Sequence, residues 1–163
     1  MERHVSRKTR EIEAYFAASP KTDAILVVKR GGSPDDVVKF HVNKAFLSYH
    51  SDYFDRLFNG DYKEKTMPAI PIENVNFAKF ARFLRTIDLD PLFPTYKTVE
   101  DLLQLADRFL MPAVTRIVEN FLLAHQYPDD LVAKLTWADR YRLDKLMAMC
   151  FATTPPRSVS TTI

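Results

Sequence analysis

Two short apolar runs, joined by a turn-forming sequence, set the first limit on the fold. The run DAILVVKR, residues 23–30, is almost continuously aliphatic and ends at a pair of glycines, which predicts a strand buried on both faces. The run VVKFHV, residues 37–42, supplies a partner strand, so a hairpin is expected around GGSPDD. A third short strand is expected at AIPI, residues 69–72.

Helical spacing of apolar residues dominates the rest of the chain. Helices are expected within residues 5–19, in KAFLSYHS after a cap at Asn43, in DYFDRLF after a cap at Ser51 or Asp52, after Asn76, after a Thr98–Asp101 capping box, from Pro112, and as a hairpin from Pro128 to Ala152. The third of these should stop at Asn59-Gly60, where a left-handed backbone costs little. The 163 residues, 47% of them hydrophobic, suffice for one domain. The predicted class is α+β, with strands early and helices late.

Charge and cysteine content exclude several classes of partner. The net charge is +2, from 23 basic and 21 acidic residues, so no overall field attracts nucleic acid or an acidic membrane surface. Cys150 is the only cysteine, which rules out an intrachain disulfide and predicts an intracellular protein, cytoplasmic or nuclear. No apolar run reaches the ~18 residues that a membrane span needs, and no signal peptide is expected.

No pattern of catalytic or metal-binding residues is present. The four histidines, His4, His41, His50 and His125, lie on separate predicted elements, and their spacing does not predict a zinc site. The sequence has neither a GxSxG elbow nor a glycine-rich phosphate loop. Cys150 lies in a Met-rich apolar stretch, which favours a packed thiol over a reactive one. We therefore expect no enzymatic activity, no metal and no cofactor.

Two predicted helices carry more apolar side chains than a small core needs. Ile12, Tyr15 and Phe16 form a stripe on the N-terminal helix, and Phe46 and Tyr49 leave the helix after Asn43 apolar nearly all round. Excess of this kind is typical of an interface. The alternative is that both helices simply cover the sheet.

A second unexplained feature is the aromatic residue in Tyr62-Lys63-Glu64, just after Asn59-Gly60. Its ring could fold back onto the core, stack on a ligand or contact another protein. Packing on Phe58, four residues earlier, is the simplest intramolecular interpretation.

The sequence also resembles a known family. FHVNKAFLSYHSDYFDRLF, preceded by DAILVV and followed by LLQLADRF, is similar to the BTB/POZ domain over about residues 22–124. The segments VNKAFLS and FNGDYKEK resemble those of the nematode BTB and MATH-BTB (speckle-type POZ-like) proteins. The resemblance implies a three-stranded sheet flanked by helices, residues 1–21 as a dimerisation arm, and residues 128–152 as a helical pair like the family's 3-box. Residues 153–163 are expected to be a disordered tail.

The resemblance also implies roles for individual residues. Asp23 and Lys44 match a charged pair near the family's dimer cleft, where each neutralises the other. The dimer interface would further include Ile12, Tyr15, Phe16, Phe46 and Tyr49. Tyr62 and Glu64 match the family's cullin-binding hydrophobic-x-Glu motif, in which the ring enters an apolar pocket of the cullin, and Phe109 matches another position near that contact.

Two functions stay open at this stage. The chain could be a dimeric adaptor that recruits an unknown substrate protein to a cullin-3 ubiquitin ligase. It could instead be a homo- or hetero-oligomerisation module of a transcriptional or scaffolding complex. Both predict self-association or pairing with related BTB proteins, without nucleic acid or membrane.

Overall fold

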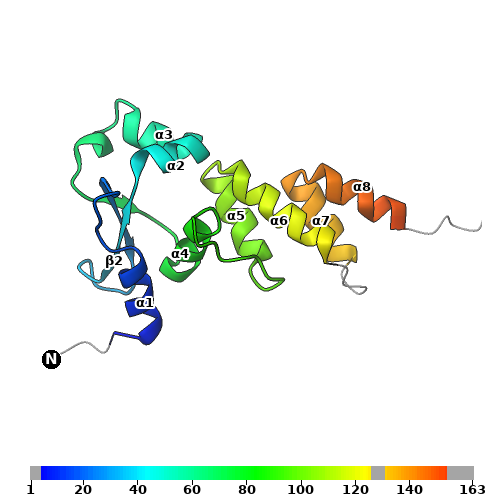
Figure 1. Cartoon of the computed structure of the whole chain (residues 1–163), viewed down its shortest axis with the longest axis horizontal. Helices are drawn as coiled ribbons and strands as arrows, with labels where there is room; N and C mark the ends of the chain where they lie inside the picture. The colour runs from blue at the N-terminus through cyan, green and yellow to red at the C-terminus, as the bar shows by residue number, and fades with distance from the viewer. Residues whose placement is uncertain (1–4, 126–130, 154–163) are drawn as a thin grey trace, which may run out of the picture.

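The computed structural model describes residues 5–125 and 131–153, and these residues form an α+β structure, as predicted. Figure 1 shows the strands and α1 at one end and the C-terminal helices at the other. The elements in chain order are α1 (Arg7–Tyr15), β1 (Ala24–Lys29), β2 (Val37–Val42), α2 (Lys44–His50), α3 (Asp52–Asn59), the 3-10 helix η1 (Lys63–Thr66), β3 (Ile70–Ile72), α4 (Phe77–Arg85), α5 (Val99–Arg108), α6 (Pro112–Ala124), α7 (Leu131–Tyr141) and α8 (Asp144–Thr153).

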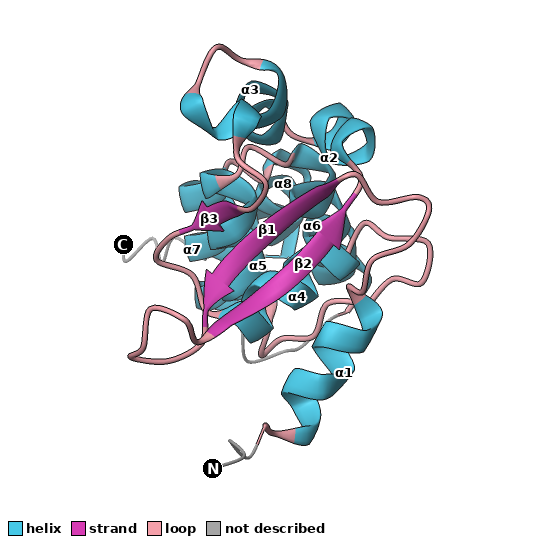
Figure 2. Ribbon diagram, turned by 90° about the vertical axis from the view of Figure 1, so that its left-hand side faces the viewer, coloured by secondary structure: helices cyan, strands magenta, loops and turns pink. Residues whose placement is uncertain are grey.

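The three predicted strands form one sheet in the order β2-β1-β3. β1 pairs antiparallel with β2 and parallel with β3, so that Leu26 lies opposite both Phe40 and Ile70. The prediction that the first strand is buried on both faces is wrong, because burial alternates along β1 and β2. Within the described ranges, helices cover one face of the sheet only, and Figure 2 shows the strands in front of these helices.

The buried face of the sheet packs on a core rich in aromatic rings. Phe40 contacts Phe16, which directly follows α1, and Phe80 from α4, with ring centroids 4.9 and 5.2 Å away. Phe80 in turn lies 5.6 Å from Phe109 at the end of α5. These large buried rings join the sheet to the helical part in one core, and aromatic pairs in such edge and tilted geometries add to the energy of burial.

Most predicted helix starts are confirmed by the caps. The side chains of Asn43, Ser51 and Asn76 accept hydrogen bonds from the first-turn amides of α2, α3 and α4. The predicted capping box of α5 is wrong, because the Thr98 hydroxyl makes no cap and donates instead to the Thr95 carbonyl at 3.0 Å. Its oxygen also accepts from the Thr95 amide, so a local turn occupies the group that would have capped the helix.

The helical pair α7–α8 packs on the preceding helices through buried polar contacts. Lys134 of α7 is only 4% exposed, and its ammonium donates to the Leu122 and His125 carbonyls, at 3.1 and 2.7 Å, at the end of α6. This position suits a cation, since the last carbonyls of a helix are unpaired and carry partial negative charge. Glu119 of α6 accepts from the amides of Lys145 and Leu146 and so caps α8.

The prediction of a hairpin near residues 128–152 is supported by α7 and α8, although its expected start at Pro128-Asp129-Asp130 lies outside the described residues. The tail predicted to be disordered also lies outside them, apart from Thr153, which ends α8. No helix in the described ranges has the length and hydropathy needed to cross a bilayer.

Glu100 of α5 joins the helical pair to the rest of the core. Its carboxylate accepts hydrogen bonds from the Trp137 indole and from the Tyr141 hydroxyl, both on α7. Burial raises the pKa of Glu100, but the hydrogen bonds from Gln104, Trp137 and Tyr141 and the charge of Arg140 together lower it below its ordinary value of 4.5. The folded structure therefore favours the ionised carboxylate.

This depressed pKa predicts that the helical pair loosens in acid. A carboxyl whose pKa falls on folding stabilises the fold above its unfolded pKa, and this contribution is lost as pH falls through the folded pKa. We expect the fluorescence of Trp137, the only tryptophan, to shift to the red as pH falls below 4.5. Glu100→Gln should weaken this acid transition, whereas Glu73→Gln, which removes an exposed ion pair with Lys29, should leave it unchanged. Equal effects of the two substitutions would contradict the assignment.

Candidate protein-binding surfaces

The described residues contain no group of three His, Cys, Asp or Glu side chains that could hold a metal ion. Cys150 is buried, and this burial raises the pKa of its thiol, which fits a packed rather than a reactive cysteine. Chemistry therefore gives no candidate site in this part of the chain. The candidates are surfaces where apolar side chains are exposed.

The stripe on α1 joins the protomer's own core more than the sequence suggested. Phe16 is only 6% exposed, and the Tyr15 hydroxyl donates to Asp88 at 2.8 Å while its ring lies 4.0 Å beneath the Arg85 guanidinium. Burial and the Asp88 hydrogen bond raise the pKa of Tyr15. The interpretation that this stripe exceeds the needs of the core is thus wrong for Phe16, because α1 packs against β2 and α4. Ile12 and Tyr15 stay partly exposed, and their role in a dimer stays a prediction.

Helix α2 presents the exposed side chains that the sequence predicted. Leu47 points into the core, whereas Phe46 is 38% and Tyr49 87% exposed. Phe46 lines a hollow of about 420 Å³, together with Tyr15, Phe16 and Leu89. Of the residues predicted for a dimer interface, Tyr15, Phe16 and Phe46 therefore meet at one surface hollow, whereas Ile12, Lys44 and Tyr49 do not line it.

The predicted charge pair of Asp23 and Lys44 takes another form. Asp23 is exposed, and its Oδ1 accepts a hydrogen bond of 2.7 Å from the backbone amide of Lys44. No ion pair joins the Lys44 ammonium to Asp23 among the described residues, so the expected mutual neutralisation is wrong for the protomer. Asp23 instead satisfies an amide in the first turn of α2, where the helix dipole favours a carboxylate.

Tyr62 lies on the surface between α3 and β3. Its side chain is 61% exposed, and it precedes η1, which carries the half-buried Glu64. The ring lies beside Gly60, and among the described residues Phe58 pairs with the ring of Phe54 and not with that of Tyr62. Tyr62 therefore forms no aromatic pair with Phe58, and most of its ring is open to a partner.

Gly60 fixes the position of this ring, for a reason the sequence did not indicate. Its φ is −72°, so the expected left-handed conformation is wrong, and its amide donates to the Arg56 carbonyl at 2.9 Å. A Cβ at this position would collide with the Arg56 carbonyl oxygen and lie 2.9 Å from Cδ2 of Tyr62. The glycine is needed for close approach rather than for a special backbone angle.

Gly60→Ala should therefore destabilise the end of α3 and displace the Tyr62 ring. We expect a loss of about 1–3 kcal/mol in the free energy of unfolding, as for other overpacked sites, measured by urea denaturation. Gly32→Ala is the matched control, since nothing lies within 4 Å of a Cβ there. Equal stabilities of the two variants would contradict the close packing of Arg56 and Tyr62 around Gly60.

Phe109 cannot take the contact role that the sequence suggested. Its ring is 0% exposed and lies 5.0 Å from Tyr53 and 5.5 Å from Phe54. Its carbonyl accepts a hydrogen bond of 2.5 Å from the buried Ser51 hydroxyl. Phe109 therefore supports α3 from inside, and the neighbouring Leu110, with φ 47°, is the residue that reaches the surface.

Sequence reasoning missed one exposed apolar segment. Leu89 and Phe93 are 94% and 76% exposed in the connection between α4 and α5, where the two prolines of DLDPLFPTYK allow only an edge strand or a loop. Leu89 borders the same hollow as Phe46. Hydrophobic residues in a proline-containing segment, which cannot join a helix face, were the available signal.

Comparison with known proteins gives consistent matches. The sequence model of the BTB/POZ domain matches residues 13–126. The BTB/POZ domain-containing protein Y57A10B.3 of Caenorhabditis elegans is 33% identical over 84% of this chain and 41% of its own length. BTB and MATH domain-containing protein 36 of the same organism is 34% identical over 80% and 38%.

More distant matches extend beyond nematodes. Kelch-like protein 23 of Mus musculus is 26% identical over 61% of this chain and 18% of its own length. The solved BTB domain of human gigaxonin aligns with a TM-score of 0.49 and 20% identity, over 74% of this chain and 98% of that one. The chain spans about two fifths of the length of the nematode relatives described above.

Proposed function

This chain belongs to the BTB/POZ domain family, and we propose that it is a dimeric adaptor that recruits substrate proteins to a cullin-3 RING ubiquitin ligase. The BTB/POZ domain is a protein-interaction module. Our proposal adds the partner, the dimer and an intracellular site of action. Substrates would be held by another part of a longer protein, by a related BTB protein in a heterodimer, or by this domain itself.

The exposed ring of Tyr62 is the observation that carries the proposal. It is 61% exposed, stands at the family's hydrophobic-x-Glu position, and is held over Gly60 rather than packed in the core. Glu64 follows on η1, whose turn fixes the spacing between ring and carboxylate. An aromatic anchor beside a polar group is the arrangement that dominates many protein interfaces.

A second candidate is an oligomerisation module that never contacts a cullin. The hollow beside Phe46 and the exposed Leu89 support this candidate as much as they support the adaptor, because self-association needs only this surface. The two candidates differ in whether Tyr62 and Glu64 contact a cullin.

The test measures direct binding to the N-terminal domain of cullin-3 by biolayer interferometry. We expect binding by the wild-type chain and a loss of about 2 kcal/mol or more in Tyr62→Ala, as for a hot-spot ring. Tyr49→Ala is the control, since Tyr49 on α2 also carries an exposed ring, 87% against 61% for Tyr62. The oligomerisation module would be the better account if the wild-type chain showed no binding at concentrations on the order of tens of micromolar. It would also be the better account if both variants lost affinity equally.

A further inference from the structure

A small cleft between α1 and α4 carries cationic side chains that neither the proposed self-association nor cullin binding uses. It measures about 160 Å³, and its walls include the apolar side chains of Ile12, Phe16, Ala81 and Leu92. Three cationic side chains border it: Lys8 from α1, and Arg82 and Arg85 from α4. The space corresponds to roughly five water molecules at ~30 Å³ each, enough for one side chain.

The cations around this cleft are poorly matched by acids of the chain itself. Lys8 and Arg82 make no side-chain hydrogen bond or ion pair with any described residue. Nε of Arg85 is buried without a hydrogen-bond partner in the same part of the chain, although its Nη2 approaches Asp90 at 3.4 Å. Buried donors are normally satisfied, so an unsatisfied one beside a cavity needs an explanation.

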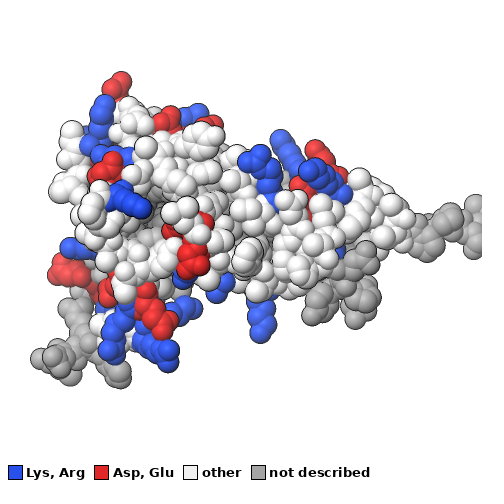
Figure 3. Space-filling view, viewed as in Figure 1, with Lys and Arg blue, Asp and Glu red and all other residues white. Residues whose placement is uncertain are grey.

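The acidic residues nearby are already engaged or turned to other partners. Glu11 lines the cleft, but its carboxylate pairs with Arg7 at 2.9 Å. Asp88 accepts the hydrogen bond of Tyr15, whose ring holds the Arg85 guanidinium in place from below. Figure 3 shows blue and red side chains mixed around α1, so the region is not a broad basic patch. Excess positive charge is local to the cleft.

We propose that this cleft binds the carboxylate of an acidic side chain carried on an apolar segment of a partner protein. Guanidinium groups suit carboxylates, because they offer several donors in a planar fork. The apolar walls would cover the aliphatic carbons of the segment. The Glu11 carboxylate in the same cleft disfavours the doubly charged phosphate of a phosphopeptide more than a singly charged carboxylate.

The proposal is independent of cullin binding, since Tyr62 and Glu64 do not line the cleft. It gives the domain a second contact of its own, on the side of α1 that faces α4. Tyr15 and Phe16 line both this cleft and the hollow beside Phe46. A ligand in the cleft would therefore also stabilise the position of α1.

The test uses a fluorescein-labelled peptide of alternating Glu and Leu residues, and a matched peptide with Gln for Glu, in anisotropy titrations. We expect the Glu peptide to bind more tightly than the Gln peptide. The double variant Lys8→Gln with Arg82→Gln should bind the Glu peptide about tenfold more weakly, because charge-assisted hydrogen bonds are lost. Folding should be unaffected, since neither side chain has a partner in the described structure.

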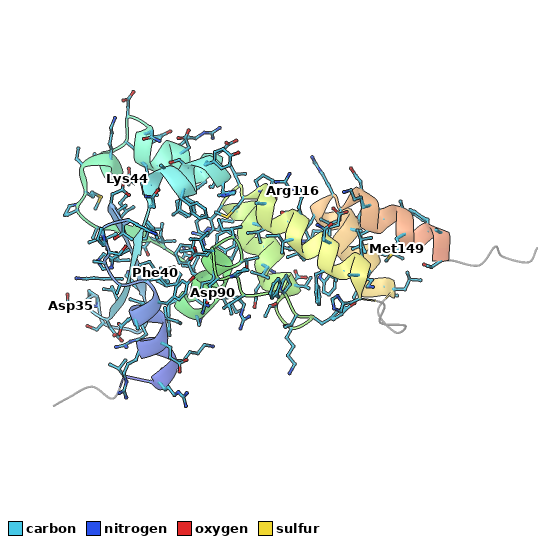
Figure 4. The ribbon with its side chains drawn as sticks, in the orientation of Figure 1. Asp35, Phe40, Lys44, Asp90, Arg116 and Met149 are labelled. Carbon is cyan, nitrogen blue, oxygen red and sulfur yellow. The ribbon has the colours of Figure 1, made fainter. Side chains whose placement is uncertain are left out.

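The control is Arg116→Gln, which removes one exposed cation on α6, far from α1 (Figure 4). This variant and Tyr62→Ala should bind the Glu peptide like the wild type. Equal weakening by Arg116→Gln, equal affinity for both peptides, no binding of the Glu peptide, or tighter binding when phosphoserine replaces Glu would each overturn the carboxylate assignment.

Discussion

Phe109→Ala is expected to cost about 3–5 kcal/mol of unfolding free energy, the usual range for deleting a buried aromatic ring. The ring is fully buried and contacts Tyr53, Phe54, Phe80 and Phe83 from two helices, with centroids 5.0 to 5.7 Å away. Neighbours on two different helices cannot all move into the space, so a cavity remains and its cost adds to the lost burial. Urea or thermal denaturation measures the change.

The matched comparison for Phe109 is Leu110→Ala, one residue away. Leu110 is exposed, so its truncation should cost less than about 0.5 kcal/mol. If Phe109→Ala were as stable as Leu110→Ala and lost only partner binding, the ring would be a surface contact after all, and the core described above would be wrong at this corner.

Phe46→Asp is expected to dissociate the proposed dimer without unfolding the protomer. A carboxylate at the partly exposed Phe46 would be buried unpaired in a two-fold interface, which costs about 3 kcal/mol or more, over a hundredfold in the dissociation constant. In the free protomer the change is mild, because Phe46 lies in the first turn of α2, where its amide already meets Asn43 and the dipole favours an acid. Sedimentation velocity measures the mass.

Val132→Asp controls for the added charge. Val132 is an exposed apolar residue in the first turn of α7, so the same substitution there leaves the proposed interface intact. We expect this variant to stay dimeric. A dimeric Phe46→Asp would place the interface elsewhere, and the exposed Leu89 and Phe93 would be the next residues to test.

Local signals in the sequence predicted the elements well. The caps at Asn43, Ser51 and Asn76 and the helix start at Pro112 depend only on neighbouring residues, and the structure contains each of them. The strands were found for the same reason. The error on β1 arose because an aliphatic run cannot tell which faces of a sheet will receive helices, and only one does.

Contacts between distant segments could not be predicted in this way. Glu100 accepts hydrogen bonds from Trp137 and Tyr141, which lie 37 and 41 positions further along the chain. No spacing rule indicates contacts at such separations. The burial of Phe109 depends on rings from α3 and α4 in the same way. The exposed Tyr62 was identified by its position in a family motif, and that match says nothing of the Gly60 backbone that holds the ring.

The mass of the complex with the N-terminal domain of cullin-3, measured by light scattering after size-exclusion chromatography, tests adaptor and dimer together. The account predicts one species that contains two copies of this 18.9 kDa chain and two cullin domains, reduced by Phe46→Asp to one copy of each and abolished by Tyr62→Ala. A chain that elutes alone, as a monomer and apart from the cullin, would contradict it.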